Sequence, residues 1–151
     1  SDGLRSLLDM PIPNMVEKTL RYPGHIQKII DLKNNGYFAP EKINNTAESL
    51  INDWAPEKGD YDQTIMRLEF SGIKDGKEIT ETFDLIDYFD KQKNITSMAR
   101  TTGYTCAAVA NIILSGDFKQ NGVFTLENFG EETKLVDNIL YYLSERNIQF
   151  N

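Results

Sequence analysis

The clearest alternation of hydrophobic and polar positions lies in the middle of the chain. Apolar side chains alternate with polar ones from residue 64 to residue 70, which is the period of a β-strand with one buried face. Asp75 and Gly76 follow, and this pair tolerates the positive φ angles that a tight turn requires. A second alternating segment places three apolar residues on one face: Ile79, Phe83 and Leu85. The sequence therefore predicts a β-hairpin at about 63–88.

Apolar residues recur at helical spacing on both sides of this hairpin and predict four helices. The helices are expected at about 23–35, from Asn45 or Thr46 to Pro56, from Thr96 or Ser97 to Gly116, and at about 131–146. Short strands are predicted at 15–22 and 148–150. The expected fold is α+β, with a small mixed or antiparallel sheet flanked by four helices, in one domain over 1–151.

Composition and charge narrow the classes of function. The 151 residues are 40% hydrophobic, which is typical of one folded domain. The formal net charge of -7 argues against a nucleic-acid partner, since such partners attract clustered Lys and Arg. A single cysteine, Cys106, and a single histidine, His25, exclude an internal disulfide and a Cys/His zinc cluster, so no metal is expected.

The sequence shows no targeting or membrane-spanning pattern. No apolar run approaches the roughly 20 residues that cross a bilayer, so no membrane partner is expected. Charged residues interrupt the opening segment, which therefore lacks a signal-peptide pattern: Asp2, Arg5 and Asp9. Together with the lone cysteine, these features favour a cytoplasmic protein.

Two groups of residues are candidates for anion binding. Arg21 and His25 flank the expected start of the first helix, where a cation beside free N–H groups suits a substrate carboxylate. Arg100, Thr101 and Thr102 bring a guanidinium and two hydroxyls into one turn, which suits an anion as well. The alternatives are structural: an ion pair for Arg21, local packing for His25, and a helix-capping turn at 100–103.

Other polar and reactive residues are assigned structural roles. Asp84, Asp87 and Asp90 are interpreted as a solvated face, and Cys106 as a buried structural thiol. The glycines never take the 1, 3, 6 spacing of the dinucleotide fingerprint, and no phosphate loop is present. No cofactor is therefore expected to bind to this chain by itself.

Two stretches together resemble the saccharopine dehydrogenase family, which includes lysine 6-dehydrogenase-like enzymes. The first is EKTLRYPGHIQKIIDLKNNGYF at 17–38, and the second is ITSMARTTGYTCAAVANIILSGDFKQNGVFTLE at 95–127. The opening SDGLRSL, at 1–7, resembles the segment that precedes the first motif in bacterial members. The chain departs from the family pattern at 125–126, where Thr and Leu replace two prolines, and at 104–105, where Tyr-Thr replaces an aromatic-proline pair.

The resemblance implies a two-part enzyme of lysine metabolism. An N-terminal Rossmann domain would bind NAD or NADP, while this chain would be the substrate-binding and dimerisation domain that lacks the Rossmann half. Residues 96–151 would pack against that domain, and a homodimer is expected. In the family reaction an amine is oxidised, hydride passes to the nicotinamide, and the imine is hydrolysed.

The resemblance also suggests which residues meet the amino-acid substrate. Ser1 and Asp2 match a segment near the bound substrate in family members. The general acid/base is expected in the Rossmann half, so the catalytic residues stay unassigned. Arg21 and Arg100 match family-typical positions, where they would either touch substrate or brace the domain junction. Two other functions stay open: a non-catalytic ligand-binding or dimerisation module, and a dehydrogenase acting on polyamines.

Overall fold

The computed structural model describes residues 10–57 and 59–151. The chain divides into two compact units, of which one contains Tyr61–Asn151 and the other is Ile12–Asp60. Among the described residues, the first unit holds the sheet and three helices, and the second holds two helices. In the part of the chain that the structure describes, every helix is too short or too polar to span a lipid bilayer.

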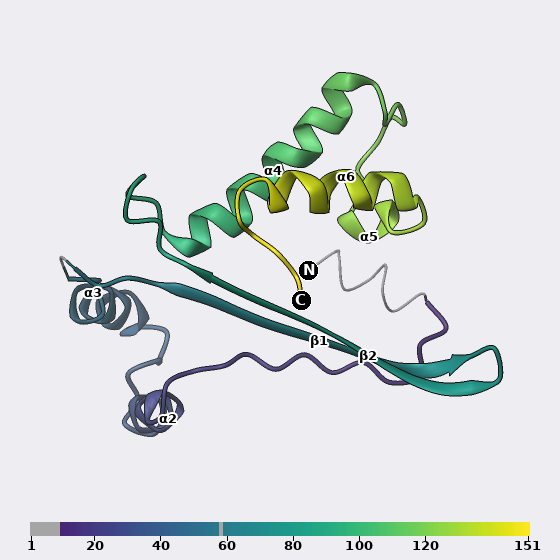
Figure 1. Ribbon diagram of the computed structural model, residues 1–151. Helices are drawn as coiled ribbons and strands as arrows, with labels where there is room; N and C mark the ends of the chain where they lie inside the picture. The colour runs from purple at the N-terminus through teal and green to yellow at the C-terminus, as the bar shows by residue number, and fades with distance from the viewer. Residues whose placement is uncertain (1–9, 58) are drawn as a thin grey trace. The chain divides into compact units, whose positions relative to one another are not determined.

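The predicted hairpin is confirmed. Strands β1 (Gln63–Lys74) and β2 (Lys77–Tyr88) pair in antiparallel register. Asp75 and Gly76 connect them with φ angles of 53° and 74°, the left-handed conformations that the sequence predicted for this turn. The turn projects beyond the helices of this unit (Figure 1).

Helix α4 (Ser97–Ser115) follows the hairpin, as predicted. The hydroxyl of Thr96 accepts a hydrogen bond from the N–H of Ala99 at 3.1 Å and caps the helix. Gly116, with φ of 77°, ends it in the left-handed conformation that glycine adopts without a Cβ clash. Helix α6 (Thr133–Ser144) packs across α4 and confirms the fourth predicted helix (Figure 1).

The core of this unit consists of two apolar clusters that α4 and α6 share. Leu85 of β2, Leu143 and Ile148 form one cluster, to which Tyr104 of α4 and Ile139 of α6 add partly buried side chains. Ile112, Phe129 and Leu135 form the other. Burial of these side chains fixes the two helices on each other and on one end of the hairpin.

A short helix, α5 (Leu126–Phe129), was not predicted. It begins after Thr125, whose N–H donates to the side-chain oxygen of Asn128 at 3.0 Å. A proline cannot make this bond, because it lacks the N–H. The departure from the family pattern at 125–126 is therefore compatible with a well-formed local turn.

The predicted strand at 148–150 is reduced to one bridging residue. Phe150 pairs with Leu85 in an isolated antiparallel bridge. Asn151 exchanges two backbone hydrogen bonds with Asp84, both 2.9 Å long. This short contact covers the outer edge of β2 at one point.

The Ile12–Asp60 unit contains α2 (His25–Asn34) and α3 (Ile43–Asp53), so both predicted helices exist. The start of α3 was predicted too late: Thr46 lies inside the helix, where its buried hydroxyl donates to the carbonyl of Tyr37 at 2.7 Å. The predicted strand at 15–22 is wrong, since this segment is in no strand and is exposed.

The observed architecture is therefore α+β, as predicted, with a two-stranded antiparallel sheet. The described residues contain five helices, one more than expected because of α5.

Candidate functional site

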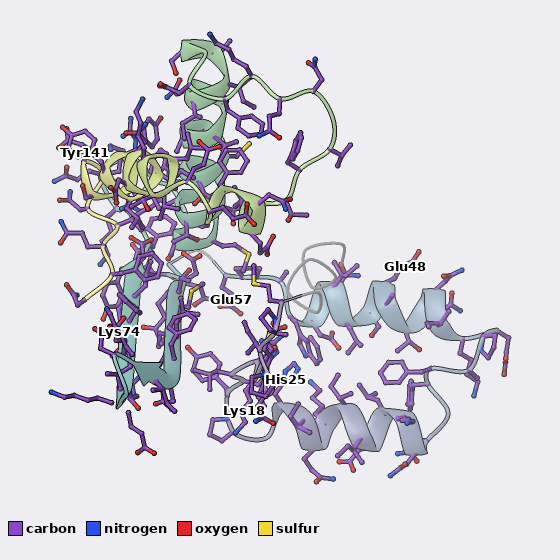
Figure 2. All side chains as sticks on the ribbon, turned by 90° about the vertical axis from the view of Figure 1, so that its right-hand side faces the viewer. Lys18, His25, Glu48, Glu57, Lys74 and Tyr141 are labelled. Carbon is purple, nitrogen blue, oxygen red and sulfur yellow. The ribbon has the colours of Figure 1, made fainter. Side chains whose placement is uncertain are left out.

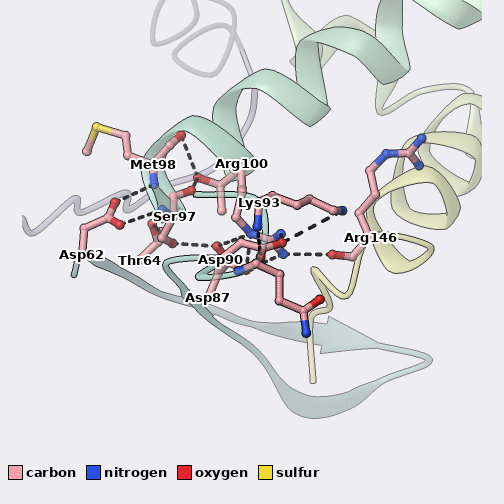
Figure 3. Close-up of polar contacts among 11 residues, drawn as sticks. Asp62, Thr64, Asp87, Asp90, Lys93, Ser97, Met98, Arg100 and Arg146 are labelled. Carbon is pink, nitrogen blue, oxygen red and sulfur yellow. Dashed lines mark hydrogen bonds and ion pairs between the residues drawn. The ribbon is translucent and has the colours of Figure 1, made fainter. Parts of the chain in front are cut away.

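A polar network surrounds the first turn of α4 and joins it to both strands (Figure 3). Asp62, just before β1, accepts hydrogen bonds from the N–H groups of Ser97 at 2.7 Å and Met98 at 2.9 Å. These N–H groups have no partner within the helix, and a carboxylate there also interacts favourably with the helix dipole. Asp62 therefore fixes the start of α4 on the base of the hairpin.

Ser97 connects the two strands to the helix. Its side chain is fully buried, with Oγ 2.8 Å from Thr64 Oγ1 on β1 and 2.7 Å from Asp87 Oδ2 on β2. A hydroxyl has one proton, and an ionised carboxylate can only accept. Ser97 thus donates to Asp87, while the hydroxyl of Thr64 donates to Ser97.

Arg100 is the centre of the network. Its side chain is 7% exposed and its Nε and Nη2 lie 3.2 to 3.3 Å from the carboxylate oxygens of Asp87, which is 4% exposed. Nη1 donates to Asp90 at 3.1 Å, and Nη2 also donates to the carbonyl of Arg146 at 2.9 Å. At least four of the five guanidinium N–H groups are thereby engaged within the protein.

The charge on Arg100 is held in place by its neighbours. The hydrogen bond to Asp87 and the negative charges of Asp87 and Asp90 raise the pKa of the guanidinium above its ordinary value. A buried cation with two buried or half-buried carboxylates is a structural element that tolerates little change, because removal of one partner leaves the other unpaired.

Asp90 closes the connection between β2 and α4. Its Oδ1 accepts from the N–H groups of Lys93 and Gln92 at 2.9 and 3.0 Å, and its backbone bridges to Ile95. The hydrogen bond from the backbone of Lys93 is the largest cause that lowers the pKa of Asp90. The hydrogen bond from Gln92 and the positive charges of Lys93 and Arg100 act in the same direction. The carboxylate therefore stays ionised at neutral pH.

An open depression of about 220 Å³ lies over the network. Its lining comes from the end of β2, the following loop, α4 and the turn after α6: Ile86, Asp87, Tyr88, Asp90, Arg100 and Asn147. Beside it, the Arg146 guanidinium lies 3.4 Å from the ring centre of Tyr142 and 5.5 Å from that of Tyr104. Cation–π contacts of this kind hold Arg146 while its carbonyl binds Arg100.

The two threonines after Arg100 have different surroundings. Thr101 is half-buried, and its hydroxyl donates to the carbonyl of Ser97 at 3.0 Å. Such back-bonding satisfies a hydroxyl inside a helix. Thr102 is exposed on the outer side of the same turn. Of the three predicted anion-binding residues on α4, Thr102 is thus the most accessible.

Arg21 and His25 belong to the Ile12–Asp60 unit, in which Arg21 precedes α2 and His25, labelled in Figure 2, is the first residue of that helix. Arg21 is exposed, and its Nη1 donates to the carbonyl of Leu20 at 2.9 Å. His25 is half-buried, with its ring centre 5.4 Å from that of Trp54. The predicted residues Ser1 and Asp2 lie outside the residues that the structure describes.

Two structural assignments made from the sequence are wrong. Asp84 does lie on an exposed face, where it pairs with Arg67 at 2.7 Å, but Asp87 and Asp90 face the network instead of solvent. The two-residue period of a strand could have identified Asp87 as an inward-facing residue, because it shares a face with Leu85 and Phe83. Cys106 is exposed on α4 and is not a buried thiol.

The connection between β2 and α4 lacks the glycine-rich turn of a Rossmann dinucleotide site. A Rossmann site needs a glycine-rich turn between a strand and a helix. Here the connection from β2 to α4 is the sequence FDKQKNIT at 89–96, which contains no glycine. Gly76 and Gly116 serve the hairpin turn and a helix end instead.

Comparison with known proteins identifies the family. No solved structure matches the chain. The family model described as the saccharopine dehydrogenase C-terminal domain matches residues 2–148, almost the whole length. The chain therefore belongs to the saccharopine dehydrogenase C-terminal domain family.

Proposed function

We propose that this chain is the substrate-binding and dimerisation part of an NAD(P)-dependent, saccharopine dehydrogenase-like oxidoreductase. The enzyme would act on the CH–NH group of a lysine-derived amino acid in the cytoplasm. The match to the family model over residues 2–148 carries this proposal. The α+β fold is compatible with it, and the connection from β2 to α4 contains no glycine-rich turn of the Rossmann kind.

The cofactor would bind to an N-terminal Rossmann domain of the same protein, whose nicotinamide would accept the hydride. Residues 96–151 would pack against that domain. The exposure of apolar side chains on α4 supports this placement: Met98 is 71% exposed, Ile113 53% and Leu114 84%. Ala107 and Ala110 also lie on α4 and would allow a neighbouring helix or sheet to approach closely.

Recognition of the substrate would depend on its carboxylates. Arg21 offers an exposed guanidinium and His25 an imidazole at a helix start, both suited to an anion. On α4, Thr102 offers an exposed hydroxyl, and Ser1 and Asp2 are candidates by their family positions. For Arg100, the ion pairs with Asp87 and Asp90 support the bracing role over direct contact with substrate. Thr101, the next residue on α4, would share this bracing role with Arg100.

The proposal is tested by calorimetry and turnover. The protein carrying its Rossmann domain should bind NADH or NADPH and oxidise a lysine-derived amino acid, whereas the 151-residue chain should bind neither nucleotide. Stoichiometric nucleotide binding by the 151-residue chain would overturn the proposal that the Rossmann domain alone binds the cofactor. Turnover of a polyamine in preference to a substrate with carboxylates would overturn the proposed substrate class.

A further inference from the structure

Within residues 10–57 and 59–151, the outer edge of β1 carries a row of backbone groups that have no backbone partner. Just beyond the paired residues, the N–H of Phe89 donates to the carbonyl of Asp62 at 3.1 Å. Residues of an antiparallel pair alternate between bonding to the partner strand and pointing away from it. The backbone groups of every second β1 residue from Gln63 to Ile73 therefore point away from β2. Among residues 10–57 and 59–151, no backbone hydrogen bond reaches these groups.

The side chains along this edge are suited to burial. Met66, Leu68 and Phe70 lie on one face of β1 and are 42%, 39% and 58% exposed. The strand has 12 residues, contains no proline and carries a lysine only at its last position. A long strand edge is a template for pairing with another chain, and β1 has neither the proline nor the short length that blocks such pairing.

We propose that β1 of a second copy of this chain covers this edge in antiparallel register, with the two-fold axis at Leu68. This inference rests on the homodimer of the proposed function and names its contact surface. The result would be a four-stranded sheet in the order β2, β1, β1, β2. An antiparallel pair of identical strands is self-complementary, as a two-fold interface requires.

Charge complementarity selects this register. With Leu68 opposite Leu68 of the second copy, Arg67 lies opposite the second copy's Glu69, and the reverse pair forms by symmetry. Arg67 already pairs with Asp84 of its own hairpin at 2.7 Å, so each arginine would lie between two carboxylates. Opposite charges across strands stabilise a pair and like charges destabilise it.

Neighbouring registers are less favourable. An axis at Arg67 would place Arg67 opposite itself, and an axis at Glu69 would place two carboxylates opposite each other. If one β1 strand were shifted by a single residue relative to the other, backbone groups that point toward the second copy would lie opposite groups that point away from it. Hydrogen bonds between the two strands could then not form. With the axis at Leu68, the apolar row Phe83, Leu68, Leu68, Phe83 is continuous across the sheet.

Disulfide trapping tests the register directly. In a Cys106→Ser background, Leu68→Cys should form an intermolecular disulfide on oxidation, because opposite residues in a non-hydrogen-bonded pair have Cα atoms about 4.5 Å apart. The matched control is Phe70→Cys, whose two copies would lie about 13 Å apart along the strands and should not crosslink.

A charge change tests the interface without altering the apolar face. Glu69→Lys should weaken the dimer at least about tenfold in sedimentation, because each introduced lysine would lie opposite Arg67 of the other copy. Glu78→Lys makes the same change on the exposed surface of β2 and should leave the dimer intact.

The outcomes separate this inference from the proposal on which it rests. A chain that stays monomeric at all concentrations would overturn both the dimer and its surface. A dimer in which Leu68→Cys does not crosslink, or in which Glu69→Lys and Glu78→Lys behave alike, would overturn only the surface. Hydrogen exchange that protects the β1 edge in a monomer would also overturn it, by showing that the same chain covers the edge.

Discussion

Ser97 and Asp87 form a 2.7 Å hydrogen bond in which both side chains are almost completely buried. The bond joins the first residue of α4 to the end of β2, and Arg100 neutralises the carboxylate from the next turn of the helix. The position of α4 on the hairpin therefore depends on a small set of polar contacts as well as on apolar packing.

Replacement of Asp87 by alanine should destabilise the fold strongly. The buried guanidinium of Arg100 would lose its main partner, and the loss of one member of a buried pair costs about 3–5 kcal/mol. Urea unfolding followed by circular dichroism measures the difference. Asp84→Ala, which removes the exposed partner of Arg67, is the control and should have a far smaller effect. Equal losses for the two variants would contradict a buried network.

Asp62→Ala should weaken the start of α4. The N–H groups of Ser97 and Met98 would lose their acceptor, and the loss of an N-cap costs about 1 kcal/mol. Hydrogen exchange should report faster exchange of those two amides, with little change at the C-terminal end of α4. Unchanged exchange would mean that Thr96 alone caps the helix.

The stability of the fold should fall in acid. Hydrogen bonds from the backbone of Lys93 and Gln92 lower the pKa of Asp90 in the folded state, relative to an ordinary value of 3.8. The unfolded chain therefore binds the proton more readily, so the contribution is present above about pH 4 and is lost as the pH falls through the folded pKa. Urea midpoints between pH 5 and pH 2.5 measure this loss.

The matched variant for acid sensitivity is Asp90→Asn, which cannot titrate. Its urea midpoint should depend less steeply on pH than that of the natural chain. The pKa of Asp117 is also lowered, mainly by its hydrogen bond from Lys134 and less by that from Ser115. Asp117 accounts for part of the pH dependence that the variant retains. Identical pH profiles for the natural chain and Asp90→Asn would exclude a role for Asp90.

The thiol of Cys106 should react readily with a thiol reagent in the isolated chain, because the side chain is exposed on α4. In the protein that carries its Rossmann domain, the same thiol should react much more slowly, because residues 96–151 are proposed to pack against that domain. The rate of labelling in native buffer measures both. Equal rates in the two proteins would count against the proposed docking of α4.

Arg21→Met should weaken substrate binding without affecting the fold. The side chain is exposed, while a charge-assisted hydrogen bond to a carboxylate contributes about 1.5–3 kcal/mol, which corresponds to roughly 10- to 100-fold in affinity. Lys18→Met removes a positive charge from the same exposed segment and serves as the control. A similar loss in both variants would indicate general electrostatic attraction instead of a site at Arg21.

The local signals of the sequence were sufficient for most secondary structure. The Asp75-Gly76 turn and the alternation around it predict the hairpin, and Thr96 and Gly116 mark the ends of α4. The strand predicted at 15–22 is wrong because local sequence can favour an extended segment without supplying a partner strand, and in the described residues this segment pairs with none. Thr46 failed as a cap because its hydroxyl binds a carbonyl nine positions away in the chain.

The site was harder to predict, since its contacts join distant residues. The motif around Arg100 predicts an anion-binding residue, but it does not identify the partners of the guanidinium, which lie in β2, in the loop after it and after α6. Asp87 could have been found by strand period, because a carboxylate on the apolar face of a strand needs a buried partner. The exposure of Cys106 depends on which face of α4 meets α6, which helical spacing alone leaves open.

The bond between Arg100 and the carbonyl of Arg146 spans 46 positions in the chain, and that between Asp62 and Ser97 spans 35. Closing such long loops is slow compared with forming a hairpin or a single helix. We expect the network to be absent from the transition state for folding. Substitutions in it should then accelerate unfolding while leaving the folding rate nearly unchanged, so that the network governs how long the native domain persists.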